Sequence, residues 1–155
     1  MWSTLSRSPC FHLTACSSFS DRDNHLRQVA HNESLLDHLE TTCPNSFNDW
    51  KVTLVFYTAL HLIRAFCKHT GVVVGVSHKE LQIAMNNRGS SVPNLDVDMD
   101  CTNHYNSLYA ASRQARYDGM ESNILFETSN QRRLTFSKIK LQKIKDHLKA
   151  KGLPI

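Results

Sequence analysis

Residues 49–69 read DWKVTLVFYTALHLIRAFCKH and carry a strong helical pattern. At about 100° per residue its apolar side chains gather on one broad helical face, which must be buried against other helices. The residues of that face are Val52, Val55, Phe56, Ala59, Leu60, Leu62, Ile63 and Phe66. The stretch therefore predicts a long helix, over about 47–69, at the centre of an all-α protein.

A second strip of the same helix is aromatic and polar. It holds Trp50, Leu54, Tyr57, His61, Arg64 and Lys68, which lie within about 80° of one another. A strip that met only water would not need Trp, Tyr and Leu. We expect it to meet another helix, a second subunit or a ligand. Core His and Tyr side chains satisfied by hydrogen bonds would give the same pattern.

Capping signals place the ends of this helix and of the one before it. A helical period begins at Asp21 and ends before residues 43–46, where Pro44 blocks continuation. Ser46 with Asp49 resembles a capping box that opens the central helix. Gly71 suits its C-terminal cap.

The remaining chain predicts two or three further helices. Ser77 and Glu80 form an S-x-x-E capping box at the start of one of them. We expect a short helix over 78–87 closed by Gly89, a helix over about 95–117, a loop or short extended piece over 121–130, and a helix over about 130–150. Short links between such helices predict a single antiparallel bundle of four to five helices over residues 21–152.

Residues 1–20 differ in composition from the rest of the chain. They are rich in Ser and Thr and contain one Arg and no acid. One positive charge is too few for an organelle transit segment, and no apolar core of a secretory signal is present. We expect a disordered tail or an over-extended start of the reading frame.

The overall composition is typical of a soluble globular protein, with 41% hydrophobic and 21% charged residues. No apolar run approaches the roughly 18 residues of a membrane span. The five cysteines show no CxxC spacing, which favours reduced thiols and a cytoplasmic location. No metal ligand set and no Gly-rich phosphate loop is evident, so we expect no metal and no cofactor.

Positive charge is concentrated near the C-terminus. The net charge of the chain is +4, and residues 132–151 hold eight Lys or Arg against the single acid Asp146. This segment therefore carries +7, and the other residues together carry about −3. Such a lysine-rich helix either faces solvent or contacts a phosphate backbone.

Residues 105–119 read YNSLYAASRQARYDG and place another strip on one side of a helix. Tyr105, Tyr109, Ser112 and Arg116 share that side, with Arg113 at its edge. The guanidinium forks suit carboxylate or phosphate, and the tyrosines suit stacking on bases. Salt bridges to acids of the first helix, or of the link before the central helix, are the alternative.

In this order, DWKVTLVFYTALHLIRAF, SHKEL and YNSLYAASRQARYDG resemble a branch of the HEPN superfamily of small helical domains, with its FYxALH and SRxARY motifs. The resemblance covers roughly residues 25–150. It implies a bundle of four or five helices, often dimeric and often tied to RNA or nucleotide biology. The matching positions are Trp50, Phe56, Tyr57, Ala59, Leu60, His61, Ser77, His78, Tyr105, Leu108, Arg113, Ala115, Arg116 and Tyr117.

The catalytic members of that superfamily are metal-independent ribonucleases. Their motif is an Arg and a His separated by four to six residues, in which Arg stabilises the developing charge and His handles the 2′-hydroxyl proton. In this chain no His follows Arg113 or Arg116 within that reach. Arg64–His69 has the spacing, but such pairs occur about as often as chance predicts. The sequence therefore argues against ribonuclease activity.

We expect a non-catalytic binding domain for RNA or nucleotide phosphates. A metal-independent ribonuclease or toxin-like enzyme, whose Arg and His meet only in three dimensions, is one alternative. A module for homodimerisation or for binding a partner protein is the other. The expected ligand-binding residues are Tyr57, His61, Arg64, His78, Tyr105, Arg113, Arg116 and Tyr117.

Overall fold

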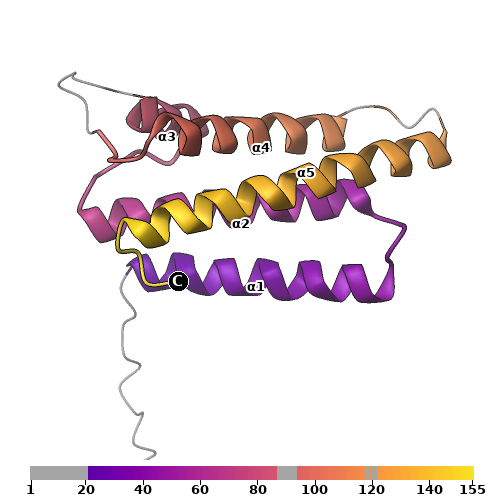
Figure 1. The fold of residues 1–155 in the computed structure, drawn as a ribbon, viewed down its shortest axis with the longest axis horizontal. Coiled ribbons are helices and arrows are strands. Elements are labelled where there is room, and N and C mark those ends of the chain that lie inside the picture. The colour runs from indigo at the N-terminus through magenta and orange to yellow at the C-terminus, as the bar shows by residue number, and fades with distance from the viewer. Residues whose placement is uncertain (1–20, 87–93, 118, 120–121) are drawn as a thin grey trace, which may run out of the picture.

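The computed structural model describes residues 21–86, 94–117, 119 and 122–155. These residues form five helices and no strand, which confirms the all-α prediction (Figure 1). The helices are α1 (Asp21–Thr42), α2 (Asn48–Thr70), α3 (His78–Asn86), α4 (Met99–Tyr117) and α5 (Asn123–Ala150). The expectations for residues 1–20 and for Gly89 lie outside the described residues.

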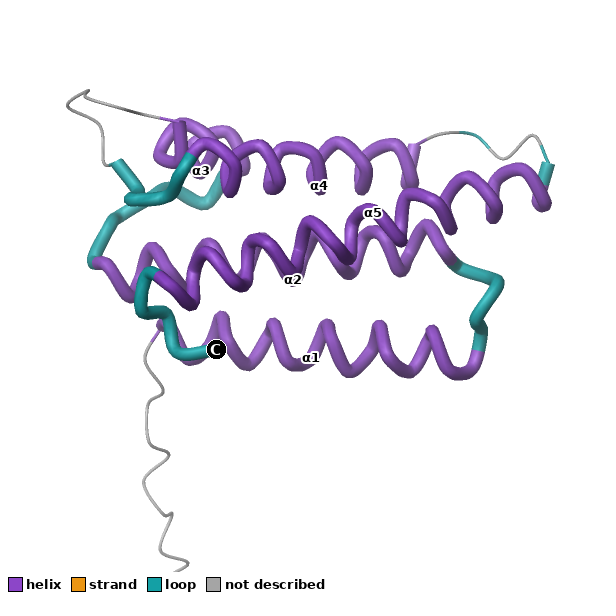
Figure 2. The backbone as a smooth tube through the Cα atoms, in the orientation of Figure 1, coloured by secondary structure: helices purple, strands orange, loops and turns teal. Residues whose placement is uncertain are grey.

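Helix α2 is the centre of the bundle, because α1, α4 and α5 each pack against it. Consecutive long helices run antiparallel, so that α2 and α5 run in the same direction (Figure 2). The predicted apolar face of α2 is the core, and Val55, Phe56 and Ile63 are fully buried there. The aromatic and polar strip is exposed at its ends, at Trp50 and Lys68, and half-buried between them.

Two of the predicted caps are present. The Ser77 backbone N–H donates to Glu80 Oε2 over 3.1 Å, and the Glu80 N–H donates to Ser77 Oγ over 3.2 Å. This is the reciprocal capping box that starts α3. Gly71 ends α2 with a left-handed φ of 73°, and its N–H donates to the Cys67 carbonyl.

The predicted capping box at the start of α2 is wrong. Phe47 occupies the cap position with a left-handed φ of 58° and makes no side-chain cap bond. The carboxylate of Glu127 on α5 accepts the N–H groups of Phe47 over 3.0 Å and of Asn48 over 3.2 Å. Ser46 and Asp49 are not needed, because a carboxylate from another helix satisfies these donors and complements the helix dipole.

Lys51 closes the turn between α1 and α2. Its side chain is fully buried, and its ammonium donates to the carbonyl oxygens of Cys43 over 2.6 Å and Pro44 over 3.0 Å. A third donation goes to Asn48 Oδ1 over 3.4 Å. A buried ammonium has three protons to place, and this turn supplies three oxygens.

Helix α5 begins at Asn123, so the predicted loop over 121–130 is wrong for residues 123–130. This first part of the helix is held to α2 by Glu127, whose carboxylate accepts the Phe47 and Asn48 N–H groups. Two of its large apolar residues, Ile124 and Leu125, are 78% and 70% exposed, and Phe126 is half-buried. A search for an apolar helical period therefore misses it.

Helix α4 begins at Met99, four residues later than the predicted start at about 95. Leu95 is buried outside the helix, and its N–H donates to the Ala84 carbonyl of α3 over 2.9 Å. Asp98 then accepts the Cys101 N–H over 2.6 Å through its carboxylate. An N-terminal cap at Asp98 explains the later start.

Glu127→Ala removes the acceptor for two N–H groups of α2, so we expect it to lower the free energy of unfolding by about 1–2 kcal/mol. Urea denaturation followed by circular dichroism measures this loss. Asp37→Ala is the control, because it removes the same charge from an exposed position on α1. Equal stability losses in the two variants would contradict a cap supplied by α5.

Candidate functional site

A cavity of about 520 Å³ lies where α2, the start of α3 and the end of α4 meet. Its lining residues are Tyr57, His78, Tyr109, Arg113, Arg116 and Tyr117. All of these except Tyr109 belong to the predicted ligand-binding set. Tyr109 lies on the strip of α4 that the sequence pattern predicted, so that pattern could have identified it as a site residue.

The two arginines of the cavity interact with aromatic rings. The Arg113 Cζ lies 5.9 Å from the centre of the Tyr109 ring, and the Arg116 Cζ lies 5.3 Å from the centre of the Tyr117 ring. Arg116 Nε also donates to the Ser112 carbonyl over 3.2 Å. Among the residues that the structure describes, neither guanidinium has a carboxylate partner. Both retain N–H donors for an anionic ligand.

Phe56 connects the cavity to the core. This buried residue of α2 has its ring centre 5.4 Å from the ring of His78 and 5.5 Å from the ring of Tyr109. Its ring also lies 5.8 Å from that of Tyr105. Tilted aromatic pairs at such distances are favourable, and they hold the wall of the cavity in place. The sequence placed Phe56 in the core and gave no sign of this second role.

Tyr105 lies beneath the cavity and does not line it. Its side chain is fully buried, and its hydroxyl lies 3.4 Å from His78 Nδ1. Among the described residues, this nitrogen is the one acceptor within hydrogen-bond distance of the hydroxyl. A neutral His78 whose Nδ1 accepts from the Tyr105 O–H carries its proton on Nε2.

The environment of His78 favours its neutral form. Burial lowers the pKa of His78, and the positive charges of Arg64 and Arg116 lower it further. Burial also raises the pKa of the Tyr105 hydroxyl, which therefore stays protonated. A neutral His78 with Nδ1 accepting from Tyr105 offers an N–H donor at Nε2.

Besides Tyr105, two predicted residues lie outside this cavity, namely His61 and Arg64. His61 Nδ1 lies 3.0 Å from Nδ1 of His25 on α1, so the strip of α2 meets another helix at this point. Arg64 donates to the carbonyl oxygens of Gly75 over 3.3 Å and Val76 over 2.5 Å. Both side chains thus make contacts within the bundle. His25, the partner of His61, was not one of the predicted site residues.

The lysine-rich segment, residues 132–151, is largely engaged in contacts within the bundle. Three of its lysines form ion pairs and a fourth bonds to a hydroxyl. The contacts are Lys138 with Glu40, Lys145 with Glu33, Lys151 with Asp96, and Lys140 with Ser107. Such partly exposed pairs contribute little stability, but they neutralise part of the charge that a phosphate backbone would need.

Among the described residues, no three His, Cys, Asp or Glu side chains are arranged to hold a metal ion. Cys43, Cys67 and Cys101 are free thiols, and burial raises the pKa of Cys67 to about 11 and that of Cys101 to about 12. None of the described helices has the length and apolar character that crossing a membrane requires.

Comparison with protein-family models, with curated proteins and with solved structures found no match to this chain. Membership of the HEPN superfamily therefore stays a prediction from sequence.

The contact between His25 and His61 makes stability depend on pH. Burial, with the charges of His25 and Arg64, lowers the pKa of His61 to about 4, and burial also lowers the pKa of His25. In the unfolded chain a His titrates near 6.5. Below that pH the unfolded state takes up protons that the folded state does not, so the stability present above about 6.5 is lost as the pH falls toward 4.

We therefore expect His61→Gln to lose less stability on acidification than the unsubstituted protein. Urea midpoints at about pH 7.5 and about pH 5 measure the difference. His38→Gln is the control, because His38 is exposed on α1. If His61→Gln and His38→Gln show the same pH dependence, the His25–His61 contact does not control it.

Proposed function

We propose that this chain is a non-catalytic helical domain that binds RNA or nucleotide phosphates in the cavity formed by α2, α3 and α4. The observation that carries the proposal is that Arg113 and Arg116, without carboxylate partners among the described residues, line one cavity with three tyrosines and His78. Guanidinium forks bind phosphate oxygens in pairs. Aromatic rings beside them provide stacking surfaces for a base.

The size and openness of the cavity favour a single-stranded ligand. A volume of about 520 Å³ lies within the usual range for small-molecule sites. Tyr117 is 73% exposed, whereas Tyr57 and Tyr109 are half-buried. A base can stack on such rings only when it is unpaired and splayed out, as in a free nucleotide or a single strand.

The hydrogen bond between Tyr105 and His78 favours binding over cleavage. With Nδ1 accepting from Tyr105, the Nε2–H of His78 is a third donor for phosphate beside the two arginines. A general base at Nε2 would need the other tautomer, which would leave the buried Tyr105 hydroxyl without its acceptor.

A double variant that combines Arg113→Gln and Arg116→Gln is expected to weaken RNA binding at least tenfold, because both phosphate-binding forks are removed. Fluorescence anisotropy with a labelled single-stranded RNA of about ten nucleotides measures the affinity. The slope of log affinity against log salt concentration should also decrease in magnitude by about one or more. Arg132→Gln is the control, since it removes an exposed arginine of α5 that does not line the cavity.

Two results would contradict this proposal. The double variant and Arg132→Gln would show equal affinities if RNA bound elsewhere, for instance on the lysines of α5. Loss of self-association in the double variant, with RNA affinity unchanged, would support the interaction module instead. Analytical ultracentrifugation of both variants measures self-association.

Ribonuclease activity is the second candidate, because His78 lies in the same cavity as Arg113 and Arg116. An Arg and a His that are distant in sequence thus line one cavity, which no spacing motif in the sequence can reveal. If the binding proposal is right, concentrated protein with EDTA leaves single-stranded RNA intact. Cleavage to 2′,3′-cyclic phosphate ends that is lost in both His78→Gln and Arg116→Gln would establish the enzyme.

A further inference from the structure

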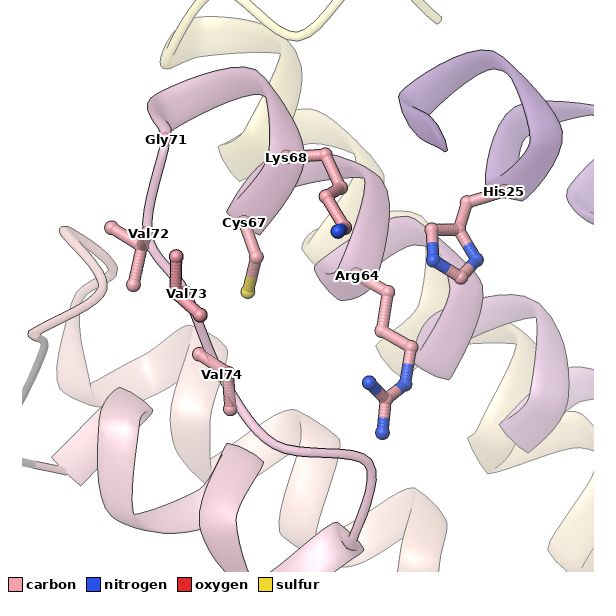
Figure 3. A pocket seen from close by; sticks show the side chains of 8 residues that line it. All are labelled: His25, Arg64, Cys67, Lys68, Gly71, Val72, Val73 and Val74. Atoms are coloured by element: carbon pink, nitrogen blue, oxygen red, sulfur yellow. The ribbon is translucent and has the colours of Figure 1, made fainter. Parts of the chain in front are cut away.

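A second, smaller cavity opens at the C-terminal end of α2, and its volume is about 160 Å³. Figure 3 shows three valines of the link after α2 along one side and the side chains of Arg64, Lys68 and His25 on the other. The sulfur of Cys67 points between the two sides (Figure 3). The cavity thus has an apolar wall facing a basic one.

The basic wall has unused hydrogen-bond donors. Arg64 gives two N–H groups to the Gly75 and Val76 carbonyls, and a guanidinium has five. Lys68 pairs with Asp21 over 3.0 Å, but both side chains are largely exposed, at 49% and 72%. Such a surface pair is weak and leaves further ammonium protons for a ligand. Within the described part of the chain, no acid lines this cavity.

The apolar wall consists of Val72, Val73, Val74 and the Cys67 thiol. Burial raises the pKa of Cys67 to about 11, so the thiol is neutral and packs as a small apolar group. A water molecule needs only about 10–15 Å³ of such space, so 160 Å³ admits a small organic molecule of several heavy atoms. A nucleotide requires the larger cavity.

We infer that this cavity binds a small aliphatic carboxylate. The carboxylate group lies on Arg64 and Lys68, and the hydrocarbon tail lies against the valines and Cys67. The cavity is next to the C-terminus of α2, where backbone carbonyls carry negative partial charge. A singly charged carboxylate therefore suits it better than a phosphate dianion, which would be repelled more strongly.

Sodium butyrate is the probe, and the full chain is titrated while backbone amides are followed by NMR. We expect saturable shifts of the Val72, Val73 and Val74 amides, with neutral butyramide and sodium chloride giving none. Lys68→Gln should weaken butyrate binding at least fivefold, because it removes one of the two cations. Lys138→Gln is a matched control, since Lys138 is 48% exposed and pairs with Glu40 as Lys68 pairs with Asp21.

Butyramide shifts equal to those of butyrate, or equal butyrate affinities in Lys68→Gln and Lys138→Gln, would overturn the inference. Arg64→Lys gives a second variant that keeps a cation but loses the fork, and it should also bind more weakly. Butyrate binding does not depend on the larger cavity. The Arg113→Gln and Arg116→Gln variant should therefore bind butyrate normally, whether or not it binds RNA.

Discussion

The arrangement of the other helices follows from the burial of α2 on most of its surface. Fourteen of its 23 residues are buried, and α1, α4 and α5 pack around it. Polar residues on such a helix must satisfy their hydrogen bonds locally, and Thr53 and Thr58 do so by donating to the Asp49 and Leu54 carbonyls over 2.9 Å. The half-buried strip is therefore the main part of α2 left to form sites.

Both cavities begin on that strip. Tyr57 contributes to the larger cavity, whereas Arg64 and Lys68 contribute to the smaller one. Arg64 donates to the carbonyl oxygens of Gly75 and Val76 in the link after α2. This link leads directly into His78 at the start of α3. The charge of Arg64 also lowers the pKa of both His78 and His25. Arg64 is thus a structural and electrostatic connection between two regions that share no lining residue.

Local pattern predicted most of the fold, because helical period and capping are properties of neighbouring residues. The face of α2, the Ser77–Glu80 box and the Gly71 cap are of this kind. Contacts between distant segments were not predictable: Glu127 capping α2 is the clearest example. The site shows the same difference between local pattern and contacts of distant segments. The strip of α4 indicated its arginines, but the tautomer of His78 depends on Tyr105, which is 27 residues away in sequence.

The cap supplied by Glu127 also bears on the order of folding. Its bonds to Phe47 and Asn48 span 80 and 79 residues, so they close a loop that contains most of the domain. Closing such a loop costs chain entropy, which local helical turns do not. During synthesis, α2 emerges long before α5 and its first turn lacks this acceptor. The N-terminal end of the central helix is therefore completed only when the last helix docks.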